Sequence, residues 1–134
     1  MKLIIAGGRS FDDYLFLKQK LDPILANISE PTTILSGRCN SGVTTFTTGG
    51  GINVCGVDGL GERYAKENNY PVDPYPANWV KYDKAAGPKR NYEMAEIATH
   101  AVCFWDGSSI GTANMIKYAK WKGVKTRVIQ ITSK

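Results

Sequence analysis

The sequence has no long apolar run, only three cysteines and a single histidine. The longest apolar stretches, residues 3–6 and 101–105, are far shorter than the roughly 20 residues that span a bilayer. Met1-Lys2 leads directly into the first stretch without the layout of a signal peptide, so we expect a cytoplasmic protein without a membrane segment. An odd number of cysteines in such a chain favours free thiols over a disulfide framework.

Metal-binding and triad patterns are also missing. The candidate ligands lack paired metal spacing, so we expect no metal and no cofactor; they are Cys39, Cys55, His100 and Cys103. His100 directly precedes an apolar stretch, and no serine-histidine-acid arrangement surrounds it. We therefore interpret it as a structural residue.

Acidic residues are absent after Asp106. The whole chain carries a formal charge of +5, and residues 107–134 hold six lysines and arginines, so the remainder sums to −1. A lysine-rich final helix is usually a solvated face. The local origin of the excess charge makes a nucleic-acid partner an unlikely expectation.

The sequence does contain an alternation of strand and helix patterns. Its length of 134 residues suits one domain, which we expect to span 1–134. We expect strands at 3–6, 33–36, 70–75, 101–105 and 125–131. Helices are expected at about 12–28, 57–68, 88–99 and 112–121, with a loop at 76–87. The alternation predicts an α/β, Rossmann-like three-layer sandwich with a five-stranded parallel sheet in the order 3-2-1-4-5.

Residues 40–56 break this alternation. Two runs rich in threonine and β-branched residues flank Gly49-Gly50-Gly51, which predicts an inserted β-hairpin. An isolated two-stranded ribbon is marginally stable in water. We therefore expect the hairpin to serve either as a flap over a site or as an arm that contacts another subunit.

Three of the predicted strands end in small residues, at the sheet edge where such folds bind ligands. Glycine lets a ligand approach the backbone, and the start of a following helix offers amide groups that suit phosphate. Arginines at the same edge add bidentate anion-binding groups. The candidates are Gly7, Gly8, Arg9 and Ser10; Ser36, Gly37 and Arg38; Arg90; and Asp106, Gly107, Ser108, Ser109, Gly111 and Thr112.

Several motifs, taken together, resemble the YspA-type (cpYpsA-related) branch of the SLOG superfamily. They are Gly7-Gly8-Arg9-Ser10-Phe11, Ser36-Gly37, the run 56–65, Pro76-Ala77-Asn78-Trp79, the run 86–94 and the run 104–112. The resemblance covers nearly the whole chain. It implies a nucleotide or nucleotide-derived ligand in the crevice, and it adds Asp58 and Asn91 to the candidate ligand-binding residues. The superfamily commonly builds sites near a dimer contact, which implies a homo-oligomer.

The same superfamily holds the Lonely Guy phosphoribohydrolases, and the similarity to them is partial. Arg90 to Met94 matches their Arg-x-x-x-Met helix start, and residues 108–112 resemble their glycine-rich loop. Their catalytic acid is replaced by Met115, which cannot stabilise a developing oxocarbenium ion. If the chain is an enzyme, Asp106 or Glu93 is the best candidate for that acid.

Two main hypotheses follow from these patterns. The first is a binder of a nucleotide-derived molecule, such as an ADP-ribose derivative, that acts as a sensor or sequesters a signal, for example in phage-host conflict. The alternative is a nucleoside-phosphate N-glycosidase or transferase. Single-stranded DNA binding, by analogy with the DprA proteins of the superfamily, ranks below both. Much of the ligand expectation depends on analogy at the level of the fold.

Overall fold

Five parallel strands form one sheet in a computed structural model that describes residues 1–8, 11–37, 56–75, 77 and 79–131. The strands are β1 Lys2–Gly7, β2 Thr33–Ser36, β3 Val72–Pro74, β4 His100–Trp105 and β5 Lys125–Gln130. Their order is β3-β2-β1-β4-β5, and every pairing is parallel. The strand order predicted from the sequence is therefore confirmed.

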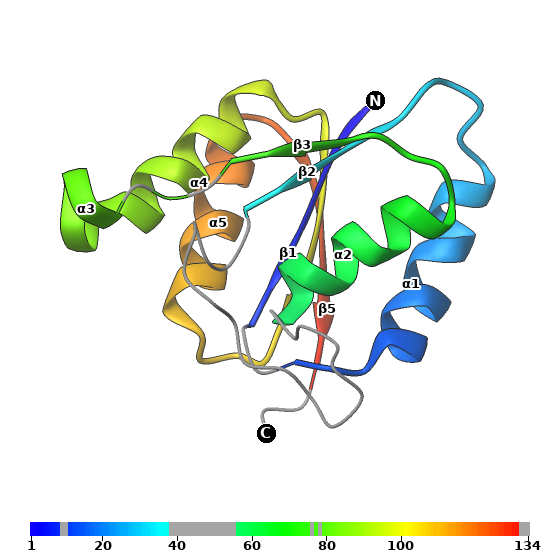
Figure 1. Cartoon of the computed structure of the whole chain (residues 1–134), viewed down its shortest axis with the longest axis horizontal. Coiled ribbons are helices and arrows are strands. Elements are labelled where there is room, and N and C mark those ends of the chain that lie inside the picture. The colour runs from blue at the N-terminus through cyan, green and yellow to red at the C-terminus, as the bar shows by residue number, and fades with distance from the viewer. Residues whose placement is uncertain (9–10, 38–55, 76, 78, 132–134) are drawn as a thin grey trace.

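Helices cover both faces of this sheet (Figure 1). The helices are α1 Tyr14–Ala26, α2 Gly56–Glu67, α3 Trp79–Tyr82, α4 Ala86–Ile97 and α5 Ile110–Trp121. Figure 1 shows α1 and α2 on one side of the strands and α4 and α5 on the other. This arrangement confirms the predicted Rossmann-like three-layer fold.

The core lies in two layers because the apolar residues of each central strand point alternately to the two faces. Leu3 and Ile5 of β1 pack in the cluster beneath α1 and α2, whereas Ile4 and Ala6 pack in the cluster beneath α4 and α5. A strand covered on both faces must be apolar at every position, which explains the unbroken run at 3–6.

Two tyrosine hydrogen bonds join α1 to α2. The Tyr14 hydroxyl donates to Glu67 Oε1 at 2.6 Å, and the Tyr64 hydroxyl donates to Asp22 Oδ1 at 2.7 Å. Burial, together with the bond to Glu67, raises the pKa of Tyr14 to about 12. These bonds, and the ring packing around them, fix the helix layer on this face of the sheet.

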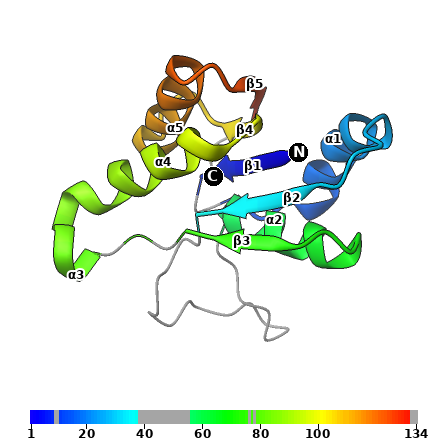
Figure 2. The same cartoon turned by 90° about the horizontal axis from the view of Figure 1, so that it is seen from above.

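The segment 76–87, expected to be a loop, contains helix in its described part, so that expectation is wrong. Helix α3 is followed by a 3-10 turn, Asp83–Ala85, and α4 then begins at Ala86, two residues before Pro88. Proline is compatible with the first turn of a helix because no amide hydrogen bond is required there. Figure 2 shows α3 at the end of α4, away from the sheet.

Other boundaries differ only slightly. Helix α5 begins at Ile110 rather than Thr112, and Pro23 lies on the exposed side of α1 without ending it. The predicted hairpin at 40–56 falls almost wholly outside the described residues. Within the described ranges, no helix combines the length and the apolar character needed to cross a membrane.

Candidate functional site

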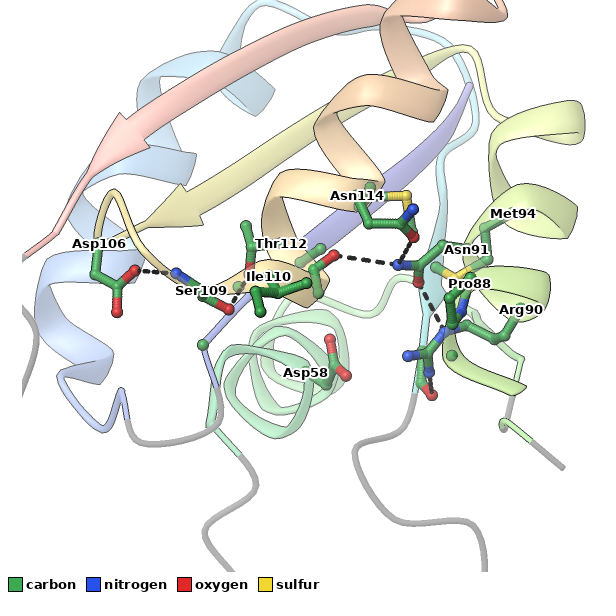
Figure 3. A pocket seen from close by; sticks show the side chains of 17 residues that line it. Asp58, Pro88, Arg90, Asn91, Met94, Asp106, Ser109, Ile110, Thr112 and Asn114 are labelled. Atoms are coloured by element: carbon green, nitrogen blue, oxygen red, sulfur yellow. Dashed lines mark hydrogen bonds between the residues drawn. The ribbon is translucent and has the colours of Figure 1, made fainter. Parts of the chain in front are cut away.

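A cavity of about 600 Å³ opens at the carboxyl ends of β1, β2 and β4 (Figure 3). The first turns of α2, α4 and α5 border it. Its described lining comprises Ala6, Gly7, Gly8, Gly37, Asp58, Gly87, Pro88, Arg90, Asn91, Met94, Asp106, Ser109, Ile110, Gly111, Thr112, Asn114 and Met115. This volume lies within the range of small-molecule sites.

The topology explains why the cavity lies there. The chain runs from β1 outward to β2 and β3, then returns to β4 on the other side of β1. The helices that follow β1 and β4, α1 and α5, consequently pack on opposite faces of the sheet. A crevice opens at such a switch point, outside the carboxyl ends of these two strands.

The turn between β4 and α5 is held by one carboxylate. Gly107 has a φ of +90°, a conformation that favours glycine, and it turns the next two amides back towards Asp106. Asp106 Oδ1 accepts hydrogen bonds from the Ser108 amide at 2.9 Å and the Ser109 amide at 2.8 Å. These backbone bonds lower the pKa of Asp106 below its ordinary value. The side chain is therefore a carboxylate near neutral pH.

The first turn of α5 presents polar groups to the cavity. The amides of Ile110, Gly111 and Thr112 precede the first intrahelical bond, which runs from the Ala113 amide to the Ser109 carbonyl. The Ser109 carbonyl also accepts a bond from Trp105 Nε1 at 3.1 Å. These two bonds hold the turn, and its amide ends carry the positive partial charge of the helix dipole.

Arg90 lies at the opposite side of the cavity in Figure 3. Its Nε–H donates to Asn91 Oδ1 at 2.8 Å, and its Nη1 donates to the Gly37 carbonyl. Two bonds to one planar guanidinium fix its orientation as well as its place. The result is a fixed positive charge beside the end of β2.

Asn91 is buried and links α4 to α5. Its Nδ2 donates to the Gly111 carbonyl at 3.2 Å and to Asn114 Oδ1 at 3.0 Å, while its Oδ1 accepts from Arg90. All the polar atoms of Asn91 are therefore engaged within the protein. Asn91 is therefore a positioning residue, which holds Arg90 and the first turn of α5 in place.

Asp58 stands in the first turn of α2 and lines the cavity close to the end of β2. A β-carbon placed on Gly37 would lie 2.7 Å from Arg90 Nη1 and 3.3 Å from Asp58 Oδ2. The absence of a side chain at Gly37 thus lets an arginine and a carboxylate approach the same point. Figure 3 shows Asp58 projecting from α2 into the region between Ile110 and Arg90.

The structure brings ten of the sequence-predicted residues to this cavity. They are Gly7, Gly8, Gly37, Asp58, Arg90, Asn91, Asp106, Ser109, Gly111 and Thr112. Three further candidates, Arg9, Ser10 and Arg38, lie outside the described residues.

Four other candidates are not among the described residues that line the cavity. Gly107 and Ser108 belong to the turn itself. Ser36 is buried and donates to Glu62 Oε2 at 2.6 Å, so it packs β2 against α2. Glu93 is half exposed and pairs with Lys89 at 3.8 Å along the outside of α4.

Sequence reasoning did not list several lining residues as ligand-binding candidates: Ala6, Gly87, Pro88, Met94, Ile110, Asn114 and Met115. Asn114 is three residues beyond Gly111 in a helix, and that spacing places both on one face. This periodicity was the available signal for Asn114. The two methionines are nearly fully buried and give the cavity an apolar floor.

No group of three histidine, cysteine, aspartate or glutamate side chains suited to a metal ion occurs within the part of the chain that the structure describes. Cys103 is a buried thiol whose pKa burial raises to about 12, so it is unreactive at neutral pH.

Comparison of the chain with protein-family models, with curated proteins and with solved structures finds no match in any of the three. The function is therefore inferred from the cavity and its side chains.

Proposed function

We propose that the chain binds a nucleotide or nucleotide-derived signalling molecule, such as an ADP-ribose derivative, in the cavity at the carboxyl edge of the sheet. In this role it acts as a sensor or as a sequestering protein. The observation that carries the proposal is the convergence, on a cavity of about 600 Å³, of the first turn of α5 with the Arg90 guanidinium. Both are suited to a phosphate group.

The remaining lining supports a ligand larger than inorganic phosphate. Met94 and Met115 form an apolar floor that suits a ring, and Ile110, 84% exposed, stands in the first turn of α5 at the cavity. Polar rims around an apolar floor are typical of sites for small organic molecules.

The alternative, an N-glycosidase or transferase, requires an acid beside the glycosidic bond. Asp106 lines the cavity, but its Oδ1 accepts hydrogen bonds from the Ser108 and Ser109 amides and is thereby engaged in holding the turn. Glu93 pairs with Lys89 on the outer face of α4. Both observations favour binding over acid catalysis.

Isothermal titration calorimetry tests the proposal with nucleoside mono- and diphosphates, ADP-ribose and cyclic ADP-ribose forms. We expect at least one of them to bind, and Arg90→Ala to weaken that binding by about tenfold or more, since a charged hydrogen-bonding group is removed. Absence of binding at ligand concentrations of about 1 mM would contradict the proposal.

Chromatography of the same mixtures distinguishes binding from the alternative, cleavage of the glycosidic bond. A binder returns the nucleotide intact, whereas a glycosidase releases free base. If base appears and Asp106→Asn abolishes its release while leaving binding intact, Asp106 is catalytic and the enzyme hypothesis replaces the one proposed here.

A further inference from the structure

We infer that the outer surface of α4 and α5 binds a second copy of this chain, through three aromatic rings that lie between rows of opposite charge. The rings belong to Tyr92, Tyr118 and Trp121, which form an aromatic patch. Such an interface goes beyond the proposed function and does not depend on ligand binding. The cavity lies at the first turn of α5, whereas Trp121 ends the same helix about 16 Å further along its axis.

The aromatic patch is ordered within one copy and is yet open to solvent. The rings of Tyr92 and Tyr118 meet edge to face with centroids 5.6 Å apart, and the Trp121 ring lies 5.9 Å and 6.5 Å from them. Trp121 is nevertheless 68% exposed. Tryptophan and tyrosine are enriched at the energetic centres of interfaces, and a ring already held by its neighbours loses little freedom on binding. The patch is therefore suited to contact with another protein surface.

Charged side chains of opposite sign flank the aromatic patch. On α5, Lys117 and Lys120 are exposed and lie about one turn apart. On α4, Glu93 and Glu96 are exposed with the same spacing along the chain. Glu93 also pairs with Lys89 at 3.8 Å, but an exposed pair of this kind is weak. A surface with a basic helix beside an acidic one is complementary in charge to its own copy.

The topology gives this surface the symmetry that a homodimer needs. Helix α4 leads from β3 to β4 and α5 leads from β4 to β5, so the two helices run in the same direction. Figures 1 and 2 show them side by side on one face of the sheet. A two-fold axis between these helices and parallel to them places α4 of each copy over α5 of the other. Each basic row then faces an acidic row, and the two aromatic patches meet on the axis.

Two other occupants fit the surface less well. A nucleic-acid strand is attracted by the lysines of α5, but Glu93 and Glu96 repel its phosphates. A cationic ligand finds its place taken, since Lys122 Nζ already lies 4.6 Å from the ring centroid of Tyr92 and 4.9 Å from that of Trp121. A second copy carries both signs of charge and meets neither obstacle.

Sedimentation velocity of the full chain over a range of concentrations tests the inference. We expect a concentration-dependent dimer, and we expect Trp121→Ala to raise its dissociation constant about tenfold or more, because the most exposed ring of the patch is lost. Leu15→Ala is the matched control: Leu15 is 70% exposed, but it lies on α1 at the other face of the sheet. Circular dichroism verifies that both variants fold. A wild type that stays monomeric up to about 200 μM, or an equal effect in the control, would overturn the inference.

Reversal of the charged rows tests the pairing of the two helices. One variant carries Lys117→Glu and Lys120→Glu and has two acidic rows, and the other carries Glu93→Lys and Glu96→Lys and has two basic rows. Each variant alone should be monomeric where the wild type is dimeric, whereas an equimolar mixture should form a heterodimer, because every row again meets the opposite charge. A mixture that stays monomeric, or a variant that dimerises alone as tightly as the wild type, would contradict this interface. A gain in mass only after a single-stranded oligonucleotide is added would assign the lysines to nucleic acid instead.

Discussion

Gly7 and Gly8 are neighbours at the end of β1, yet their surroundings are opposite. A β-carbon on Gly7 would lie 2.5 Å from Val57 Cγ2 and 2.6 Å from the Phe104 carbonyl oxygen, closer than atoms tolerate. Among the residues that the structure describes, a β-carbon on Gly8 would meet nothing within 4 Å. Both line the cavity, but Gly7 is required by packing, whereas Gly8 leaves open space for a ligand. Two adjacent glycines of one motif thus have different roles, one in packing and one in leaving the backbone accessible.

The same contrast recurs across the cavity. Gly37 is crowded by the Arg90 side chain, whereas the β-carbon position of Gly111, in the first turn of α5, has no atom of the described residues within 4 Å. The crowded glycines hold the rim in shape, and the open ones leave the backbone accessible. Substitutions at the two kinds of position should therefore affect different measurements.

The largest effect on folding is expected from Gly7→Ala. Because a backbone carbonyl of β4 cannot move without disturbing the sheet, we expect the free energy of unfolding to fall by about 3 kcal/mol, as for other overpacked sites. Urea denaturation followed by circular dichroism measures it. Gly8→Ala is the matched control and should change stability by less than about 0.5 kcal/mol. Equal losses in both variants would remove the distinction between the two glycines.

Asn91→Ala should have the next largest effect. It removes the donor that the Gly111 carbonyl and Asn114 Oδ1 now share, and it removes one of the hydrogen bonds that orient the Arg90 guanidinium. We expect a loss of about 2 kcal/mol in the free energy of unfolding. Nucleotide affinity should also fall, although both polar atoms of the Asn91 side chain are hydrogen-bonded within the protein. A variant of unchanged stability would show that this network does not join α4 to α5.

The pH dependence of folding stability should come from the layer of α1 and α2, and not from the glycines that line the cavity. The hydrogen bond from Tyr64 lowers the pKa of Asp22, and the bond from Tyr14 lowers the pKa of Glu67. Lowered carboxyl pKa values contribute stability above about pH 4, and this contribution is lost as the pH falls. The raised pKa of Tyr14 works in the opposite direction: its contribution is complete below about pH 10 and is lost as the pH rises towards 12.

Thermal unfolding of the wild type should therefore show a stability plateau that declines at both ends. Tyr14→Phe should flatten part of the decline between pH 10 and 12, since it removes one titrating group. The loss caused by Gly7→Ala involves no titrating group and should stay constant across the plateau. If that loss varied with pH in this range, the two regions would not be independent.

The smallest effect on folding is expected from Gly111→Ala. Alanine is the better helix former, and its β-carbon enters open space, so the melting temperature should stay unchanged or rise slightly. Calorimetry should nonetheless show weaker nucleotide binding, because a methyl group is added in the first turn of α5. Unchanged affinity would indicate that the ligand does not approach this part of the helix.

The sequence alone predicts the sheet well, for physical reasons visible in single segments. The apolar run at 3–6 indicates a strand covered on both faces, and the alternation of strands and helices predicts the strand order. Small residues after three of the strands indicate the edge at which the cavity lies. The sequence does not distinguish Gly7 from Gly8, because the crowding at Gly7 comes from Val57, which is distant along the chain. Asn91 was expected to contact the ligand, and only the packing of α4 against α5 reveals that its amide is used internally.

The most direct test of the central claim is the affinity of Gly8→Val for the nucleotide that the wild type binds most tightly in calorimetry. The β-carbon of the added side chain enters space where no described atom lies within 4 Å, so the melting temperature should match that of the wild type. If the cavity beside β1 is the binding site, affinity should fall about tenfold or more. Wild-type affinity in a fully folded Gly8→Val protein would contradict the account.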